Sequence, residues 1–383
     1  MRKSMKSLKN WERINMVMWK TIGETCNVIR GKRVTKGELI DDGTYPVISG
    51  GVTPMGYINS YNREANTITI SQYGTAGFVD FQTSKFWAND ICYCVYPKEN
   101  LRNRYLWYVL KNNQNLLYAI RNTEAIPYSL PMESLKNVEI PIPSIKEQNR
   151  IVGILDTFTS SIDNLKEQIA LRRKQFEHYL NKLLSFEGGH EEVKWKSIGE
   201  IGELVRGNGL QKTDFTEKGV GCIHYGQIYT RFGLSCNKTL SFVPRELASK
   251  LTVVAPGNLV IACTSENVED VCKSVVWLGD EDIVTGGHAC VFKHQEEPKY
   301  IGYCFLTNNF FIQKRKYAYG AKVIDIKTEK LALIKLPIPS LSVQRAIVQT
   351  LDTFEASIKN LEAQLDLRQK QYEYYRNKLL TFE

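Results

Sequence analysis

The chain contains one segment twice, and this repeat constrains its architecture more than any other feature. Residues 141–187, which begin with Pro-Ile-Pro-Ser, align without a gap on residues 337–383 at a shift of 196 positions. Counted from Val138 and Ile334 onward, 28 of 50 aligned positions are identical. A weaker match at a shift of 176 places residues 19–31 on residues 195–207. The sequence therefore predicts two copies of one plan, each with a variable unit followed by a nearly invariant segment.

The repeated segment has the apolar pattern of a long helix. Apolar residues recur at alternating steps of three and four over four heptads, which is typical of a coiled-coil seam. The proline-rich entry suits a helix start, with Ser144 or Ser340 as the cap. The predicted seam residues are Leu155, Phe158, Ile162, Leu165, Ile169 and Phe176 in the first copy and Leu351, Phe354, Ile358, Leu361, Leu365 and Tyr372 in the second.

We expect the two helices to pair with each other in antiparallel orientation. Each helix ends an equivalent unit, so a pseudo-two-fold axis would relate the halves. The alternative is that each helix packs only on its own unit. Arg172 and Arg368 interrupt the seam at matching positions, which would fix the register or mark a docking surface for another protein.

The variable units have the pattern of mixed, strand-rich domains. β-Branched residues and a glycine turn in residues 66–81 precede an alternating segment at 85–97, and residues 252–265 and 286–294 have similar roles in the second unit. Helical segments at 104–120 and 300–320 follow. The predicted fold class is α+β, with two mixed, β-rich domains in a pseudo-two-fold arrangement, separated by two long helices that form an antiparallel coiled coil. The predicted parts are a first domain at 1–143 with an N-terminal extension at 1–18, a helical region at 144–187, a second domain at 188–339 and a second helical region at 340–383.

Several functional classes lack their motifs in this sequence. We find no Walker A motif, no GxGxxG after a strand, no HExxH, no GxSxG and no tetrapeptide typical of amino-methyltransferases. Nine cysteines without a CxxC pair, together with five histidines, provide neither a zinc site nor a disulfide framework. No stretch approaches ~18 consecutive apolar residues, and no signal peptide is evident. We therefore predict a non-catalytic, metal-free, cytoplasmic protein without a membrane segment.

Three groups of residues have both a structural and a functional interpretation. Cys92 and Cys94 would share one face of a strand, as a buried apolar pair or as half of a metal site. His288 follows two glycines, and it would be either a turn residue or a residue that contacts a ligand. We favour the structural interpretation for the cysteines and for His288. The third group resembles a set of metal ligands only in composition, and we expect it to form a solvated loop; its members are Glu266, Glu269, Asp270, Asp280, Glu281 and Asp282.

The positive charge of the chain is concentrated in the variable units. The formal net charge is +9, of which +6 falls in residues 1–143 and +2 in residues 188–339. Lysine and arginine neutralise phosphates, while polar and aromatic side chains read or stack on bases, so this mixture favours a DNA-reading surface over a merely solvated basic face. The predicted DNA-contact residues are Arg30, Lys32, Arg33, Lys36, Gln72, Tyr73, Lys98, Arg102, Arg104, Arg121, Lys314, Arg315, Lys316, Tyr317, Tyr319 and Lys322.

Two dissimilar units, each closed by a nearly identical helix, resemble the specificity subunit of type I restriction-modification systems. The resemblance covers residues 19–383. It is strongest in PIPSIKEQNRIVGILDTF (141–158) and PIPSLSVQRAIVQTLDTF (337–354), which are similar to the family's proline-rich entry, its Glu-Gln pair and its Ile-Val-x-x-Leu-Asp helix. The second copy has Val343 in place of the glutamate.

The resemblance implies a division of labour. Each of two target recognition domains would read one half of an asymmetric bipartite DNA target, and the helices would hold the spacing and dock two modification subunits. S-adenosylmethionine, ATP and Mg would be bound by partner subunits, with restriction subunits joining through the complex. A helix over residues 155–186 would rise about 45–50 Å, which exceeds one ~34 Å turn of DNA. The alternatives are a non-catalytic coiled-coil scaffold whose units bind protein or carbohydrate, and a nuclease or methyltransferase with divergent motifs.

Overall fold

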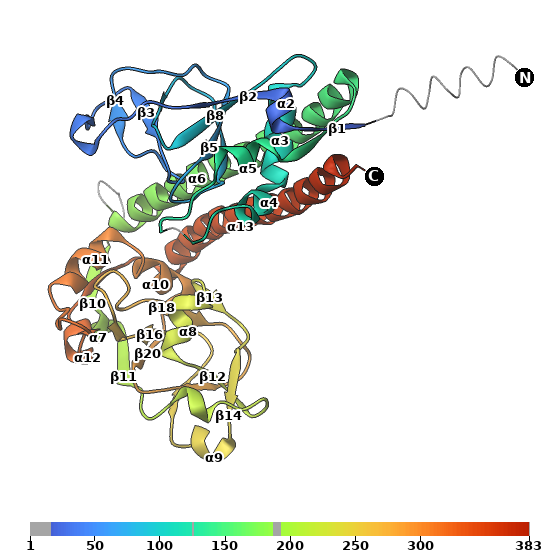
Figure 1. Cartoon of the computed structure of the whole chain (residues 1–383). Coiled ribbons are helices and arrows are strands. Elements are labelled where there is room, and N and C mark those ends of the chain that lie inside the picture. Colours follow the sequence, from blue (N-terminus) through green and yellow to red (C-terminus); the bar gives the residue numbers. More distant parts are fainter. Residues whose placement is uncertain (1–16, 125, 187–192, 383) are drawn as a thin grey trace, which may run out of the picture. The chain divides into compact units, whose positions relative to one another are not determined.

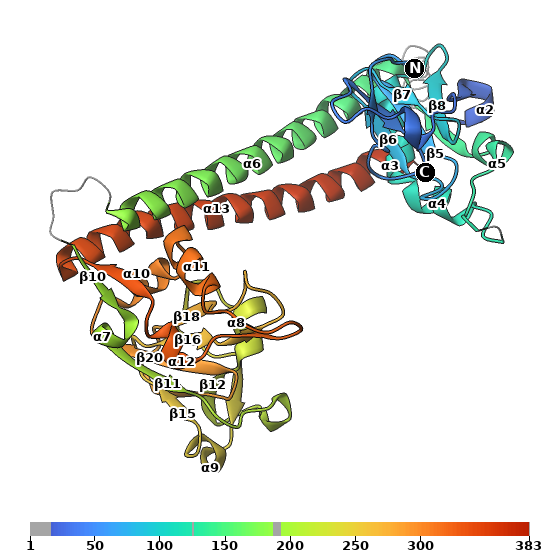
Figure 2. The same cartoon turned by 90° about the vertical axis from the view of Figure 1, so that its left-hand side faces the viewer.

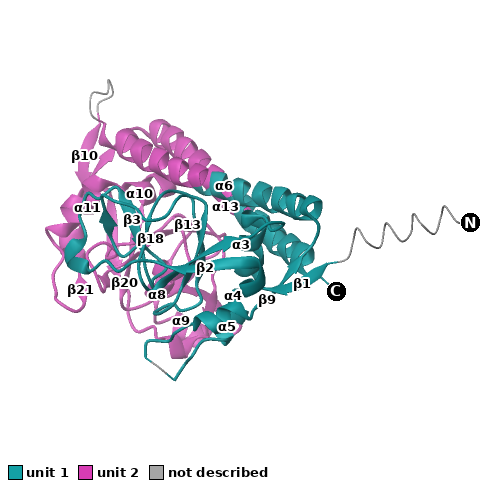
Figure 3. Cartoon of the chain, turned by 45° about the horizontal axis from the view of Figure 1, so that its top comes forward, with its two compact units in different colours: residues 1–166, 364–383 teal, residues 167–363 magenta. Residues whose placement is uncertain are grey.

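A computed structural model describes residues 17–124, 126–186 and 193–382 of the chain (Figure 1). It divides into two compact units, Met1–Lys166 with Gln364–Glu383 and Glu167–Ala363 (Figure 3). The long helices α6 (Ile145–Ser185) and α13 (Leu341–Leu380) both cross from one unit into the other. Each unit therefore contains one strand-rich domain and about half of each long helix. Most of the predicted N-terminal extension lies outside the described residues.

Unit 1 is built around a four-stranded antiparallel sheet of order β2-β8-β5-β6. A second sheet of order β4-β3-β7 contains the parallel pair β3 and β7, and β1 pairs with β9. The strands are β1 (Met18–Thr21), β2 (Cys26–Arg30), β3 (Tyr45–Ile48), β4 (Tyr57–Ile58), β5 (Thr67–Ser71), β6 (Val79–Gln82), β7 (Trp87–Ala88), β8 (Cys92–Pro97) and β9 (Glu139–Ile142). The short helices are α2 (Ile22–Thr25), η1 (Lys36–Glu38), α3 (Asn103–Asn112), α4 (Gln114–Ala119) and α5 (Met132–Lys136).

Unit 2 has the same plan with a larger second sheet. Its main sheet has the order β11-β20-β16-β18-β13, its second sheet has the order β14-β12-β19-β15, and β10-β22 and β17-β21 form two further pairs. The strands are β10 (Lys194–Ser197), β11 (Gly202–Arg206), β12 (Val220–Ile223), β13 (Ser235–Cys236), β14 (Ser241–Val243), β15 (Thr252–Val254), β16 (Leu259–Ala262), β17 (Thr264–Ser265), β18 (Ser274–Trp277), β19 (Ile283–Thr285), β20 (Ala289–His294), β21 (Ile324–Asp325) and β22 (Lys335–Ile338). The short helices are α7 (Ile198–Ile201), η2 (Lys212–Asp214), α8 (Tyr225–Thr230), α9 (Arg245–Ala248), α10 (Pro298–Cys304), α11 (Asn308–Arg315) and α12 (Thr328–Leu331).

The weaker sequence repeat forms the same local structure in both units. Trp19 pairs with Pro141 in the β1–β9 ladder, and Trp195 pairs with Pro337 in the β10–β22 ladder. The last residue of β1 and of β10 then caps the short helix that follows. Thr21 and Ser197 each form a capping box with the glutamate three residues later. The match at a shift of 176 therefore marks the entry of each domain.

A buried glutamine joins each long helix to its own domain. Gln148 and Gln344 are both fully buried. The Gln148 side chain donates to the carbonyls of Asn100 and Pro143 and accepts from the Arg102 amide at 2.8 Å. Gln344 donates to the Pro339 carbonyl and accepts from the Glu297 amide at 3.0 Å. This glutamine is the member of the Glu-Gln pair that both copies share, so the joint forms with either Glu147 or Val343 beside it.

An aspartate about two helical turns after this glutamine makes a second connection between the long helix and its domain. Asp156 accepts from Arg104 at 2.8 Å and from the Tyr108 hydroxyl at 2.6 Å. Asp352 accepts in the same way from Lys299 at 2.5 Å and from the Tyr303 hydroxyl at 2.7 Å. The repeated Leu-Asp of the helices therefore binds a basic residue and a tyrosine of the preceding domain.

The two long helices pair in antiparallel orientation within each unit (Figure 2). In unit 2, Tyr179 stacks on Phe354 at 5.3 Å between ring centroids, and Arg173 reaches Glu362 at 2.6 Å. In unit 1, Phe158 stacks on Tyr375 at 5.3 Å, and the helix ends near Leu155 and Leu380 share one core. The predicted antiparallel coiled coil is confirmed, and the alternative in which each helix packs only on its own domain is wrong.

The arginines in the seam lie against aromatic rings. The Arg172 guanidinium lies 5.9 Å from the Phe354 ring centroid, and Arg368 lies 5.7 Å from Phe158. A guanidinium stacked on a ring keeps apolar contact within the seam while its edge stays in water. Of the predicted seam residues, Leu155, Ile162, Leu165, Ile169 and Leu351 are buried. The half-buried ones are Phe158, Phe176, Phe354, Ile358, Leu361, Leu365 and Tyr372.

The Arg-Gly pair that ends β2 and β11 reflects a close approach of main chains. A Cβ atom on Gly31 would lie 2.1 Å from the Ala88 carbonyl oxygen, and one on Gly207 would lie 2.2 Å from that of Gly286. We expect Gly31→Ala to destabilise unit 1 by about 1–3 kcal/mol, because the strands must separate to admit the methyl group. Urea denaturation measures this, with Gly153→Ala on open helix surface as the control. Equal stability of both variants would contradict the prediction.

Among the described residues, no helix is both long and apolar enough to cross a membrane.

Candidate nucleic-acid interface

In unit 1, several predicted contact residues gather at one end of the main sheet. Arg30 ends β2 opposite Tyr93, which lies near the start of β8. The guanidinium lies 5.7 Å from the Tyr93 ring, and the Tyr93 hydroxyl donates to the Leu130 carbonyl at 3.1 Å. Tyr73 follows the end of β5 and pairs with Ser129. We call this region, with residues 121–124 and 126–130, the loop end of unit 1.

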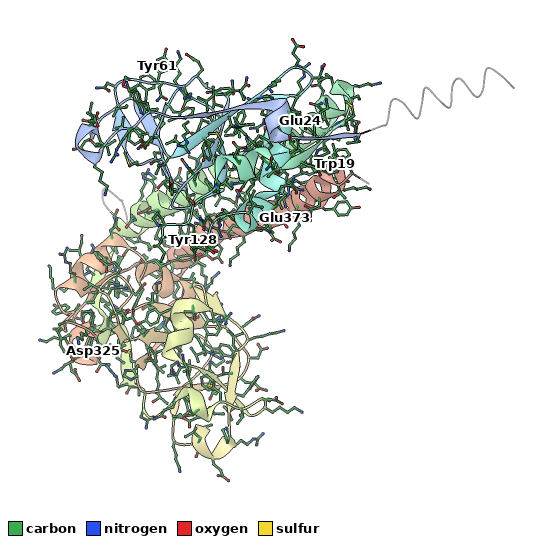
Figure 4. The ribbon with its side chains drawn as sticks, viewed as in Figure 1. Trp19, Glu24, Tyr61, Tyr128, Asp325 and Glu373 are labelled. Carbon is green, nitrogen blue, oxygen red and sulfur yellow. The ribbon has the colours of Figure 1, made fainter. Side chains whose placement is uncertain are left out.

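Arg121 is held among aromatic rings at this loop end. Its guanidinium lies 4.8 Å from the Tyr118 ring and 5.2 Å from the Tyr128 ring, and its Nε donates to the Tyr118 carbonyl. Tyr73 and Tyr128 are exposed, and Tyr128 is labelled in Figure 4. A cation held between the half-buried Tyr118 and the exposed Tyr128 can contact phosphate or stack on a base.

The basic residues after β2 are exposed beside β7. The Lys32 carbonyl accepts from the Trp87 indole at 2.7 Å, which holds this segment against the second sheet. Lys32, Arg33 and Lys36 are all exposed. They extend the basic surface that begins at Arg30.

Four other predicted residues of unit 1 are placed elsewhere or buried. Gln72 is buried, with only 5% of its surface exposed. Lys98 follows the far end of β8 and donates to the Glu24 carbonyl at 2.9 Å. Arg102 lies at the start of α3 beside Gln148, and Arg104 is bound to Asp156. Burial of Gln72 and the protein partners of Lys98 and Arg104 count against their predicted DNA contacts. The Arg102 side chain is exposed, and its DNA contact stays a prediction.

The corresponding end of unit 2 is organised by an arginine that the sequence analysis did not select. Arg206 ends β11 opposite Cys290, near the start of β20. Its Nη2 lies 3.1 Å from Asp325 Oδ2, and the Tyr319 hydroxyl lies 3.3 Å from the other carboxylate oxygen. Asp325 is labelled in Figure 4. The signal for Arg206 was present, because the shift of 176 that aligns the Arg-Gly pairs places it on Arg30.

The loop end of unit 2 comprises Arg206, His288, α8, β17 and residues 317–325. The predicted Arg315, Lys316, Tyr319 and Lys322 are exposed here or directly before it. Tyr317 packs against the core. Lys314 is buried, and its ammonium donates to the carbonyls of Glu269 and Val271 at 2.8 and 2.7 Å. Burial lowers the pKa of Lys314, and its enclosed ammonium corrects the prediction that it meets a phosphate.

Aromatic and histidine side chains add to this end of unit 2. The Tyr225 ring at the start of α8 lies 4.9 Å from His288 and 4.5 Å from His224. His288 is exposed, whereas His224 is buried and accepts from the Gly226 amide, and burial lowers the pKa of His224. No pattern in the sequence distinguished Tyr225, because its position depends on the β12–β19 pairing.

The cysteine pair is buried, and the acidic residues lie at the surface, with Asp270 half-buried and the other five exposed. Cys92 and Cys94 are buried in an apolar cluster with Phe86 and Ala88. Asp270 is paired with Lys273 at 2.7 Å. Across residues 17–124, 126–186 and 193–382, no group of three or more histidine, cysteine or acidic side chains is arranged to hold a metal ion.

Comparison with known proteins identifies relatives over nearly the whole chain. The family model described as the type I restriction modification DNA specificity domain matches residues 16–172 and again residues 190–367. A putative type I restriction enzyme specificity subunit of Haemophilus influenzae is 27% identical, with 96% of both chains covered. A type I restriction enzyme specificity subunit of Escherichia coli is 26% identical, covering 96% of this chain and 94% of that one.

Solved structures share the fold. The S subunit of a type I restriction-modification system from M. genitalium superimposes with a TM-score of 0.66 at 17% identity, covering 96% of this chain and 97% of that one. A chain from a structure titled for complex assembly and conformational transition of the type I restriction-modification system superimposes with a TM-score of 0.55 at 16% identity, covering 95% and 96%. The predicted α+β class and the family resemblance are both confirmed.

Proposed function

Because the chain belongs to the family of type I restriction-modification DNA specificity proteins, we propose that its two units read the two halves of an asymmetric, bipartite DNA target through their loop ends. The observation that carries the proposal is that both units have the same strand framework but different side chains at their loop ends. Both units place an arginine at the end of their first long strand, Arg30 and Arg206, but surround it with different residues. Shared frames suit equivalent docking on duplex DNA, and different side chains suit different half-sites.

The long helices support docking of two copies of one partner. Leu171 and Leu367 occupy repeat-equivalent positions and are 58% and 57% exposed, while Tyr179 and Tyr375 are 40% and 41% exposed. The repeat thus presents like side chains at two equivalent places, and equivalent sites suit two copies of one partner. We propose two modification subunits there, with restriction subunits joining through the complex.

The proposal assigns the chemistry to these partners. Modification subunits would bind S-adenosylmethionine and methylate adenine, and restriction subunits would use ATP and Mg. This chain would supply recognition without a catalytic group. Methyl transfer or cleavage by the purified chain alone would contradict that assignment.

Mapping methylated adenines in the source cell with and without this gene tests the function. The expected result is one interrupted, asymmetric motif that disappears when the gene is removed. Binding to duplex DNA that falls steeply with salt would support the same conclusion, because phosphate contacts release counterions. A scaffold that binds only proteins or carbohydrate would leave methylation unchanged and show no such binding.

Lys316→Ala should weaken DNA binding to a similar extent for all sequences. Lys316 is exposed directly before the loop end of unit 2, so we expect a phosphate contact and a salt slope smaller by about 1 in the variant. Fluorescence anisotropy across a salt series, on the assembled complex, measures both quantities. Lys218→Ala is the matched control, since this exposed lysine precedes β12 on the side away from the loop end. A change confined to one base position would show that Lys316 reads a base.

A further inference from the structure

We infer that Arg206, oriented by Asp325, reads a guanine in the half-site bound by unit 2. The inference rests on the proposed function and adds the residue and base to it. Asp325 is the partner that distinguishes this arginine from its equivalent in unit 1.

The main chain around Arg206 is closely constrained. Gly207 follows it with no room for a Cβ atom, and its amide donates to the Ala289 carbonyl at 2.9 Å. Arg206 itself pairs with Cys290 in the β11–β20 ladder. The Cα–Cβ bond of Arg206 is therefore aimed from a rigid strand end, which suits precise recognition better than a loop position does.

The carboxylate that meets the guanidinium is fixed as well. Asp325 lies in β21, and it exchanges two main-chain hydrogen bonds with Tyr319, at 3.1 and 2.9 Å. The Asp325 side chain is only 20% exposed, whereas that of Arg206 is 36% exposed. The carboxylate is thus the less exposed partner, and part of the Arg206 side chain is accessible to solvent.

This geometry matches the chemistry of guanine recognition. An arginine has five N–H donors in a planar fork, and one carboxylate contact leaves donors for a second partner. In the major groove, guanine presents the adjacent acceptors N7 and O6, to which an arginine binds with two hydrogen bonds. A carboxylate behind the fork restricts its rotation, so less conformational entropy is lost when the base is bound.

Unit 1 shows what the equivalent arginine does without this carboxylate. At the shift of 196, the residue that corresponds to Asp325 is Ser129. Arg30 instead lies over the Tyr93 ring. The two units thus place the same side chain in different surroundings, as two different half-sites would require.

A simple stabilising ion pair is the competing explanation, and it predicts a different result. A single ion pair that is only partly buried contributes on the order of 1 kcal/mol to stability, so the variants should remain folded. A stabilising role would change the melting temperature but not base preference. A phosphate contact would weaken binding equally for every sequence.

The test uses the specificity subunit assembled with its modification subunits and a duplex library randomised in each half-site. The retained or methylated fraction is sequenced for wild type, Arg206→Ala, Arg206→Lys and Asp325→Asn, with melting curves for each. We expect the arginine variants to lose guanine preference at one position of the unit 2 half-site by about 5- to 100-fold. Arg206→Lys should lose the preference as well, because lysine lacks the planar guanidinium that makes two parallel hydrogen bonds. Asp325→Asn should reduce the guanine preference at the same position by a smaller factor.

The control and the contrary outcomes separate the role of Arg206 from the proposed function. Arg30→Ala should leave the unit 2 half-site unchanged. A wild-type complex with no bipartite preference would refute the proposed function itself. A bipartite wild type whose preferences survive Arg206→Ala, or whose unit 2 half-site lacks guanine, would refute only the role of Arg206. Uniform weakening would make Arg206 a phosphate contact and would also refute that role.

Discussion

Exchanging residues 188–339 for the same segment of another family member should change one half of the DNA target and leave the other half intact. The reason is that each unit has its own core. The loop end of unit 2 is assembled entirely from residues 206–325, whereas that of unit 1 is assembled from residues 30–130. Each mismatched base pair costs about 1–3 kcal/mol, so a new half-site that differs at three positions should reduce methylation of the old target by at least about 10²-fold.

The measurement is methylation mapping of the hybrid complex, with the reciprocal exchange of residues 19–143 as its control. The donor must keep the basic residue and the tyrosine that bind Asp352, because the helix joint depends on them. A hybrid that altered both halves, or neither, would contradict modular reading. A hybrid that failed to bind modification subunits would point to a damaged joint, and a melting curve would reveal it.

Gln344→Leu should destabilise unit 2 by about 2–5 kcal/mol. The fully buried side chain bridges the Pro339 carbonyl, the Glu297 amide and the Glu296 carboxylate. Leucine fills a similar volume but leaves two buried main-chain groups without partners, and each unsatisfied group costs about 1–3 kcal/mol. Urea denaturation, together with hydrogen exchange at α10, measures the loss.

Matched variants come from the sequence repeat. Gln148→Leu should produce the same loss in unit 1, because its hydrogen bonds follow the same pattern. Glu147→Ala, at the half-buried neighbouring position, removes only an ion pair with Arg150 and should change stability by less than about 1 kcal/mol. Similar effects at Glu147 and Gln148 would show that helix propensity, and not the buried bridge, makes the Glu-Gln pair important.

Most of the scaffold could be predicted from the sequence. The repeated apolar positions from Leu155 and Leu351 onward indicated two long helices, and their equivalence indicated the antiparallel pair. The candidate site was predicted only in part. Arg30, Tyr73 and Arg121 do lie together, but Lys98 and Arg104 bind groups of the protein itself, and Arg206 was not selected.

The sequence by itself determined the duplicated plan, because apolar periodicity and internal identity can be read from the order of the residues whatever their contacts in the fold. Only the tertiary structure decided which basic side chains are free, because their partners are distant along the chain. Lys314 is enclosed by carbonyls 43 and 45 residues away, and Arg206 meets a carboxylate 119 residues away. A basic residue in the sequence can bind another group of the protein, remain in water or contact DNA, and the fold determines which of these its side chain can reach.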